Sequence, residues 1–157
     1  MKTNNVTRLL NQRNIPYQVF HIPAEKLGAV EASRYLGVPP KLVYKTIVVT
    51  RLERGRNILA VVPGDKIVDL KALANALGEK KFHLPTERAA ERLTGLQAGG
   101  ISPLALINRG FQVVIDASAK TLDGIYISGG IRGLNLKISP LALAELTKAI
   151  FAPIVRI

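Results

Sequence analysis

The sequence contains no cysteine and no tryptophan, and only 5% of its residues are aromatic. Without cysteine the protein has no disulfide, thiolate zinc site, iron–sulfur cluster or cysteine nucleophile, and the absence fits a cytoplasmic location. Few aromatic rings are present on which bases could stack, as they do in proteins that bind single-stranded nucleic acid. No run of about 18 apolar residues exists, so we expect no contact with a membrane.

Several sequence motifs of enzymes are also missing. The chain has no GxxxxGK[ST] phosphate-binding loop, no GxGxxG dinucleotide fingerprint and no GxSxG nucleophile motif. The two histidines, His21 and His83, are far apart in sequence, and neither belongs to an HExxH or HxH motif. We therefore expect neither a catalytic metal nor a cofactor.

Positive charge is what the sequence has in excess. Twenty-two lysines and arginines face eleven acidic residues, which gives a net charge of +11 at pH 7. Such a surface attracts polyanions, so we expect contact with nucleic acid, mainly through its phosphates. Three arginines follow the strongest predicted strand, and they form either an RNA-contact patch or a solvated turn: Arg51, Arg54 and Arg56.

Hydrophobic spacing and capping signals predict helices and strands that alternate irregularly along the chain. The expected helices are residues 3–14, with Thr3 as N-cap, 29–36, 67–77, 85–93 and 140–149. The expected strands are residues 17–22, 42–50, 57–62, 80–84, 111–116, 124–128 and 134–138, with an edge strand in the tail at 153–157. A glycine between the second and third strands predicts a hairpin. We expect one α+β domain over residues 1–157, built around a mixed sheet with flanking helices.

Lys45 is unusual because it lies in the strand LVYKTIVVT, both faces of which are mostly apolar. Alternation places it on one face with Val43, Ile47 and Val49. A lysine there either extends to solvent or faces a polar cavity. In a cavity its ammonium could hold a phosphate or stabilise developing negative charge, and partial burial would lower its pKa.

Two pairs of adjacent glycines form the second signal, one in AGGISP (98–103, the first glycine loop) and one in SGGIRG (128–133, the second glycine loop). Adjacent glycines let the backbone turn sharply and approach a ligand closely. Their amides can bind an anion or a carbonyl oxygen. Each pair alone fits a tight turn, but the two pairs and the misplaced lysine together indicate a binding site.

The order YKTIVV, AGGISP and IYISGGIRGL, in a match over nearly the whole chain, resembles the YbaK family of aminoacyl-tRNA deacylases. Members of that family hydrolyse mischarged Cys-tRNA(Pro), and relatives form the editing insertion of bacterial prolyl-tRNA synthetases. The resemblance implies a mixed α+β domain with a curved sheet, a hydrolase that edits mischarged tRNA in trans, tRNA(Pro) as the carrier of the ester, and prolyl-tRNA synthetase as a partner.

The resemblance also implies which residues act. The central lysine of the family corresponds to Lys45, which would have an electrostatic and positioning role and would not be a covalent nucleophile. Water or the substrate's own side chain would then attack the ester. The residues implied to form the substrate pocket are Thr46, Gly99, Gly100, Ile101, Ser102, Ser128, Gly129, Gly130 and Arg132.

Two positions depart from the family pattern and leave alternatives open. Ile22 stands where members often carry tyrosine, and Asn135 where they carry aspartate. Both changes alter pocket polarity, so a deacylase for a different mischarged amino acid stays open. A catalytically silent module that binds tRNA or a synthetase fits the charge equally well. A ribosome-associated basic protein also fits the charge but leaves the glycine loops unexplained.

Overall fold

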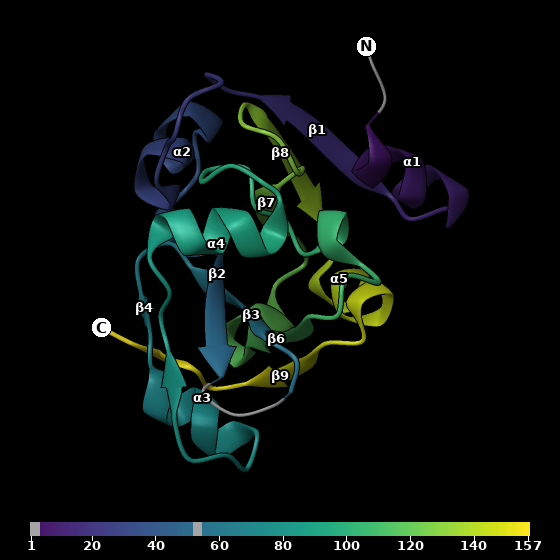
Figure 1. The fold of residues 1–157 in the computed structure, drawn as a ribbon. Coiled ribbons are helices and arrows are strands. Elements are labelled where there is room, and N and C mark those ends of the chain that lie inside the picture. The colour runs from purple at the N-terminus through teal and green to yellow at the C-terminus, as the bar shows by residue number, and fades with distance from the viewer. Residues whose placement is uncertain (1–3, 52–54) are drawn as a thin grey trace.

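The computed structural model describes residues 4–51 and 55–157, and these residues form helices interspersed with strands (Figure 1). The α-helices are α1 (Asn5–Gln12), α2 (Ala29–Leu36), α3 (Leu70–Ala76), α4 (Glu87–Thr94) and α5 (Pro140–Thr147). The strands are β1 (Tyr17–His21), β2 (Tyr44–Arg51), β3 (Ile58–Pro63), β4 (Ile67–Val68), β5 (Phe82–His83), β6 (Gln112–Asp116), β7 (Ile125–Ser128), β8 (Leu134–Ile138), β9 (Ile150–Ala152) and β10 (Val155–Arg156). The α+β class expected from the sequence is confirmed.

The central sheet has the strand order β5-β2-β3-β6-β9. β2 and β3 form the antiparallel hairpin that the sequence predicts, whereas β6 runs parallel to β3 and β9, so the sheet is mixed. β5 pairs only with Thr50 and Arg51 at the end of β2. On that side, residues 44–49 of β2 belong to no strand pair within the described ranges, and an isolated bridge joins only the preceding Val43 to Tyr126 of β7. The candidate site lies along this free edge.

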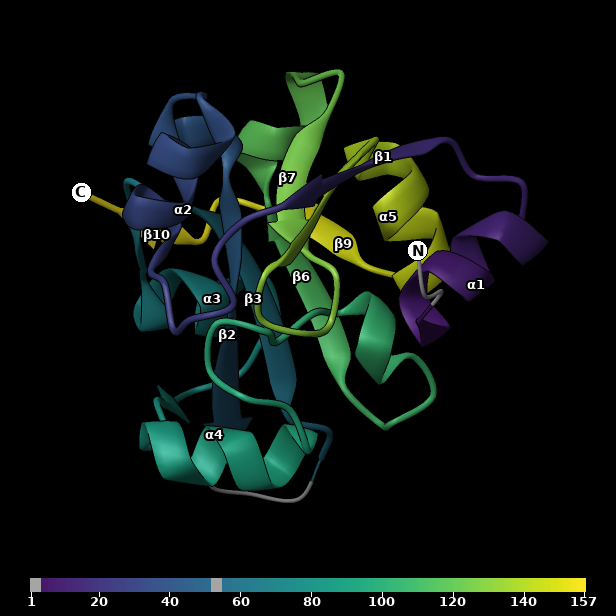
Figure 2. The same ribbon diagram turned by 90° about the horizontal axis from the view of Figure 1, so that it is seen from above.

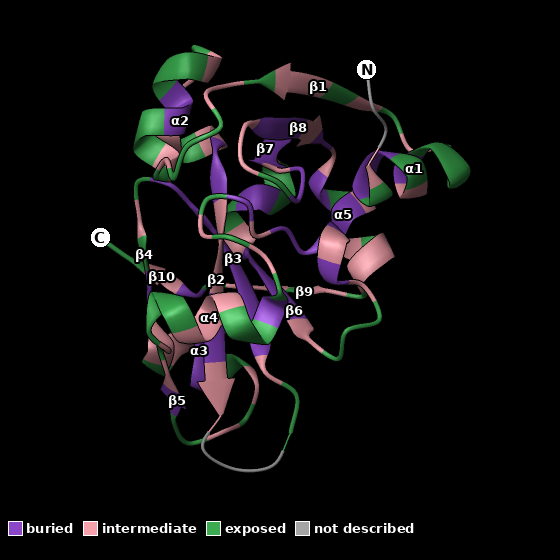
Figure 3. Cartoon of the chain, turned by 45° about the horizontal axis from the view of Figure 1, so that its top comes forward, coloured by how far each residue is buried: buried purple, intermediate pink, exposed green. Residues whose placement is uncertain are grey.

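Two hydrophobic cores cover the two faces of the central sheet. Figure 2 shows α3 and α5 on opposite sides of its central strands. One core joins β2, β3 and β6 to α1, α5 and a second, antiparallel sheet of order β1-β8-β7. The other joins the opposite face to α3 and to Ile154 near the C-terminus. All six residues of β3 are buried between these cores, while the outward faces of α2 and α4 are exposed (Figure 3).

The beginning of α1 differs in detail from the expectation. Asn4 is the N-cap, since its side chain accepts a hydrogen bond from the Thr7 amide and the Thr7 hydroxyl accepts one from the Asn4 amide. This reciprocal arrangement stabilises the first turn. Thr3, the expected cap, lies outside the described residues.

In two places the structure has two short elements where the sequence predicts one: at the expected helix 67–77 and at the expected tail strand 153–157. Ile67 and Val68 pair with β10 as a short strand, and the helix begins only after Asp69, whose side chain accepts from the Ala72 amide. The tail contributes β9 to the central sheet and β10 to the pair with β4. Both changes come from tertiary pairing between distant segments, which local periodicity does not report.

Candidate active site

A cleft of about 230 Å³ lies along the free edge of β2. Its walls come from residues 22–32, from β2 around Lys45, from the first glycine loop and from β7 and β8. Of the residues implied by the sequence, those that line the cleft are Lys45, Thr46, Gly99, Ile101 and Ser128. The two departures from the family pattern, Ile22 and Asn135, line it as well.

Lys45 is half-buried at the wall of the cleft and does not simply extend into open solvent. Burial lowers the pKa of the Lys45 ammonium from its ordinary 10.5, and the nearby charge of Asp65 opposes part of that shift. A poorly hydrated cation interacts more strongly with an anion than a fully hydrated one does. Lys45 can therefore attract a phosphate, a ribose oxygen or a developing negative charge in the cleft.

The first glycine loop brings backbone amides to the cleft. Gly99 has a φ of +89°, a conformation that favours glycine, and a Cβ atom there would lie 3.3 Å from the Cα of Lys26. The amides of Gly99 and Ile101 donate no hydrogen bond to any described residue. These two N–H groups are thus available to bind an oxygen atom of a ligand.

Gly100 lies where the first glycine loop packs against the second, and it does not line the cleft. Its amide donates to the carbonyl of Gln97, 2.8 Å away. A Cβ atom at this position would lie 3.0 Å from the backbone nitrogen of Arg132, which is too close for an ordinary contact. The missing side chain of Gly100 therefore lets the loops pack against each other.

Both ends of the first glycine loop are also held by side chains. The Ala98 amide donates to a carboxylate oxygen of Glu91 on α4, 2.8 Å away, and Arg132 Nε donates to the Ala98 carbonyl, 2.7 Å away. Ser102 is fully buried, and its hydroxyl accepts from the Leu104 amide. Arg132 and Ser102 thus position the loop without lining the cleft.

The second glycine loop contributes Ser128 to the cleft, and its glycines hold the turn. The Gly129 amide donates to the Leu134 carbonyl, and the Gly130 amide donates to the Ser128 hydroxyl, 3.2 Å away. Asn4 donates to the Gly129 carbonyl, 2.8 Å away, so the start of α1 also braces this loop. Gly129 and Gly130 lie behind the cleft wall.

Sequence reasoning missed the beginning of α2, where Gly28 and Ala29 line the cleft. Gly28 is the N-cap of α2 and provides no side-chain acceptor for the first amides of the helix. A signal existed, because a helix predicted to begin at residue 29 after a glycine has unsatisfied amides at its start. What the sequence did not show is that this start lies opposite β2.

Of the three arginines expected to contact RNA, the structure describes Arg51 and Arg56, and these two differ in exposure. The side chain of Arg51 is only 11% exposed and lies close to Glu79, with 2.8 Å between nitrogen and oxygen. It also donates to Gln112 and to the Arg56 carbonyl and stacks over Phe82. Arg56 is exposed, whereas Arg54 lies outside the described residues. Arg51 is thus held by protein groups, and the phosphate contact expected of it stays a prediction.

Within the described ranges, no group of three or more His, Asp and Glu residues comes together as candidate metal ligands. No helix in the same ranges has the length and apolar character needed to cross a membrane.

Known proteins resemble this chain in sequence over most of its length. The aminoacyl-tRNA editing domain family matches residues 24–146. A protein of Enterococcus faecalis named as a Cys-tRNA(Pro)/Cys-tRNA(Cys) deacylase, EbsC, is 31% identical over 152 residues, which are 96% of this chain and 92% of that protein. The proline–tRNA ligase of Trichlorobacter lovleyi is 30% identical over 131 residues, which are 78% of this chain and 22% of the ligase.

Solved structures resemble the chain over nearly its full length. The crystal structure of a hypothetical protein, APE2540, superposes with a TM-score of 0.88 at 26% identity and covers 98% of this chain and 100% of its own. A structure described as a trans-editing enzyme for prolyl-tRNA synthetase superposes with a TM-score of 0.79 at 21% identity over 99% of both chains, which is a likeness in fold. The chain therefore belongs to the aminoacyl-tRNA editing domain family and is an aminoacyl-tRNA deacylase.

Proposed function

We propose that the protein removes cysteine from mischarged Cys-tRNA(Pro) in trans, and that residues 1–157 form one deacylase domain that does so. The observation that carries this proposal is the cleft itself, which Lys45, Gly99 and Ile101 all line, and the amides of the two loop residues donate to no described residue. The name of the Enterococcus faecalis relative supports the choice of substrate. The site of action would be the cytoplasm, where tRNA is charged.

The proposed mechanism uses positioning and charge. The ester carbonyl oxygen lies against the amides of Gly99 and Ile101, which stabilise the oxyanion as it develops. Lys45 holds the terminal ribose or its phosphate and keeps the ester in place. Water attacks the carbonyl carbon directly, or the thiol of the cysteinyl group attacks it and forms a thiolactone that water then opens to give cysteine. In both cases the ribose oxygen leaves with the proton of the attacking group. The chain has no cysteine, and neither histidine lines the cleft, so neither provides the nucleophile.

The size and lining of the cleft support a small amino acid. At about 230 Å³ it has to hold the aminoacyl group and part of the terminal ribose. Ile22, Leu27 and Ala32 make part of its wall apolar, which suits an uncharged side chain such as that of cysteine. We expect cysteine to be released faster than larger amino acids, because the cleft is small. Alanine should also react, but more slowly, since one group of methylene size in an apolar pocket changes the free energy of discrimination by only about 1–3 kcal/mol.

The direct test is a deacylation screen with purified protein and tRNA(Pro) charged with cysteine, alanine or proline. Fastest release of cysteine, with proline retained, is the expected result. Cys-tRNA(Cys) serves as the control for recognition of the tRNA body. Slower release of cysteine from Cys-tRNA(Cys) when prolyl-tRNA synthetase is added would support that enzyme as a partner. Preferential release of another amino acid would refute the cysteine assignment, and release of none would refute deacylation of this tRNA.

A further inference from the structure

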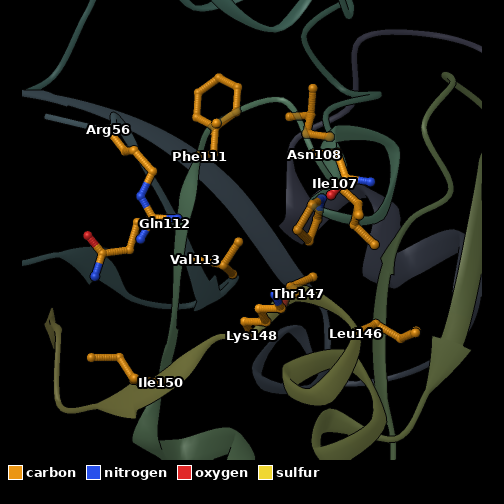
Figure 4. A pocket seen from close by; sticks show the side chains of 13 residues that line it. Arg56, Ile107, Asn108, Phe111, Gln112, Val113, Leu146, Thr147, Lys148 and Ile150 are labelled. Atoms are coloured by element: carbon orange, nitrogen blue, oxygen red, sulfur yellow. The ribbon is translucent and has the colours of Figure 1, made fainter.

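A second cavity lies at the end of the central sheet where β6 begins (Figure 4). Its volume is about 440 Å³, and its walls come from the start of β6, from residues 103–110 and from the C-terminal end of α5. It shares no lining residue with the cleft. Lys45 pairs with Val62 and Gln112 with Ile58, so the two sites are about 13 Å apart along β3 at 3.3 Å per residue.

One continuous segment of chain borders both sites. Ala98, Gly99 and Ile101 line the cleft, and a few residues later Pro103 and Leu106 line the second cavity. A ligand chain that leaves the cleft along this segment would therefore reach the second cavity within a short distance.

The charged side chains that line the second cavity are all positive. Among the described residues that line it, Arg56 and Lys148 carry positive charge and none is acidic. Both cations are exposed, so they are available to a ligand from solvent. Asn108 and Gln112 add amide groups, and Phe111 adds an aromatic ring (Figure 4). This combination suits a phosphate group joined to a ribose and a base.

Arg51 positions two residues of this cavity. One terminal nitrogen of its guanidinium donates to the backbone carbonyl of Arg56, and the other donates to the side-chain oxygen of Gln112, 2.9 Å away. Because the carbonyl oxygen of Gln112 accepts from Arg51, the side-chain NH₂ of Gln112 is oriented away from Arg51 and can donate elsewhere. The Glu79 carboxylate neutralises Arg51 from outside the cavity, which leaves Arg56 as the charge presented there.

The backbone at Lys148 adds an independent observation. Lys148 ends α5 in the left-handed conformation, with a φ of +58°. Where α2 and α4 end in that conformation, the residue is a glycine, Gly37 or Gly95. A lysine is less stable there than glycine. A lysine one turn earlier would interact equally well with the helix end, so helix stability alone does not account for Lys148.

We propose that the second cavity binds the phosphate–ribose backbone of the RNA strand that carries the ester, upstream of its 3′ end. Arg56 and Lys148 contact phosphates, and Phe111 packs against a base or ribose. The identity of the RNA as tRNA rests on the proposed function, whereas the preference for a nucleic acid strand rests on the charge and lining of this cavity. The cleft then holds the aminoacyl end while the second cavity sets the direction of the strand.

The test compares two double variants that each remove one arginine and one lysine charge. Arg56→Gln with Lys148→Gly changes the second cavity, and Arg156→Gln with Lys71→Gln removes exposed charges that line neither site. Binding of uncharged tRNA and of a short single-stranded oligoribonucleotide is measured by fluorescence anisotropy over a range of salt concentrations. Thermal unfolding accompanies each variant, and Lys148→Gly alone serves if Arg56→Gln impairs folding, since glycine suits the backbone there.

The cavity variant is expected to bind both RNAs about tenfold more weakly than the control variant near 150 mM salt, because two phosphate contacts are lost. Its slope of log affinity against log salt should fall by about 1.4, or 0.7 for each contact to a single strand. Equal affinity and slope in the two variants would overturn the proposal. So would displacement of the oligoribonucleotide by adenosine monophosphate at comparable concentration, which would identify a site for free nucleotides. Uncharged RNA is the ligand, so a wild-type protein that cleaves no ester would refute the deacylase proposal and leave this comparison intact.

Discussion

Lys45 is the residue on which the reaction depends most directly. Lys45→Ala removes the ammonium from the cleft and should lower the deacylation rate by about 10²–10³, the usual effect of one preorganised electrostatic contact. Lys45→Arg should also fail, because the planar guanidinium does not replace a compact ammonium. The free energy of unfolding should be unchanged or slightly higher, since a half-buried charge is removed. Single-turnover rates at saturating tRNA provide the measurement, and a wild-type rate for Lys45→Ala would show that its ammonium takes no part in the reaction.

The pH dependence of the reaction should report the state of Lys45. Burial lowers the pKa of Lys45 below its ordinary 10.5, and Asp65 raises it in part. If the ammonium is the active form, the rate falls as the pH rises through this lowered pKa, below the range of a free lysine. Asp65→Asn removes the attraction, so the pKa falls further and the alkaline loss of activity moves to lower pH.

The measurement is the pH profile of kcat/KM for both proteins after the rate without enzyme is subtracted, since esters hydrolyse in alkali. Asp123→Asn is the matched control, because Asp123 is an exposed carboxylate that does not act on Lys45. An alkaline limb that stays in place in Asp65→Asn would show that Lys45 is not the group being titrated.

At the scale of elements, the packing of the two glycine loops determines the shape of the cleft wall. Gly100→Ala places a methyl group 3.0 Å from the backbone of Arg132 and Ile131, and backbone atoms cannot move aside as a side-chain tip can. The loops must separate, which should cost about 1–3 kcal/mol of stability and also displace the amides of Gly99 and Ile101. Gly28→Ala is the control, because a Cβ atom at Gly28 would meet nothing within 4 Å.

Urea denaturation and deacylation rates together check this expectation. Both stability and rate should fall in Gly100→Ala, and stability should hardly change in Gly28→Ala. A Gly100→Ala protein with wild-type stability would mean that the loops are not in the close contact described.

The sequence predicted most elements, and it located Lys45, because those inferences depend on local patterns. The alternation of side chains within β2 is enough to show that Lys45 lies on a mostly apolar face of the strand. The roles within the glycine loops were harder to predict, since Gly100 and Arg132 act through contacts between segments about 30 residues apart. The same limit explains Arg51, whose partners Glu79 and Gln112 are distant in sequence, and Gly28, whose position opposite β2 is set by tertiary packing.

At the scale of the whole molecule, Asp116 joins the central sheet to the C-terminal segment. It is buried at the end of β6 and accepts hydrogen bonds from the amides of Ser118 and Ile154, at 3.1 and 3.0 Å, and from the Ser118 hydroxyl. The Ser118 hydroxyl donates to Asp116, so the Tyr44 hydroxyl, 2.8 Å away, must be the donor in its bond with Ser118. This chain of hydrogen bonds links the C-terminal segment to the strand that carries Lys45.

Asp116→Ala leaves the buried Ile154 amide without an acceptor and removes the two bonds from Ser118, which should lower the free energy of unfolding by about 2–3 kcal/mol. Asp123→Ala, at an exposed position, should change it by less than about 0.5 kcal/mol. Chemical denaturation of both variants gives the comparison, and equal stabilities would contradict the anchoring role of Asp116.

The free edge of β2 has a further consequence for how copies of the protein behave toward each other. An exposed strand edge can add a strand from another molecule, and natural proteins prevent this with charged side chains, lysine above all. Lys45 lies near the start of that edge, so the charge that serves the ester also opposes edge-to-edge association there. Lys45→Ala should therefore self-associate more than wild type at high concentration, as light scattering would show, and RNA bound in the cleft should reverse the effect by covering the edge.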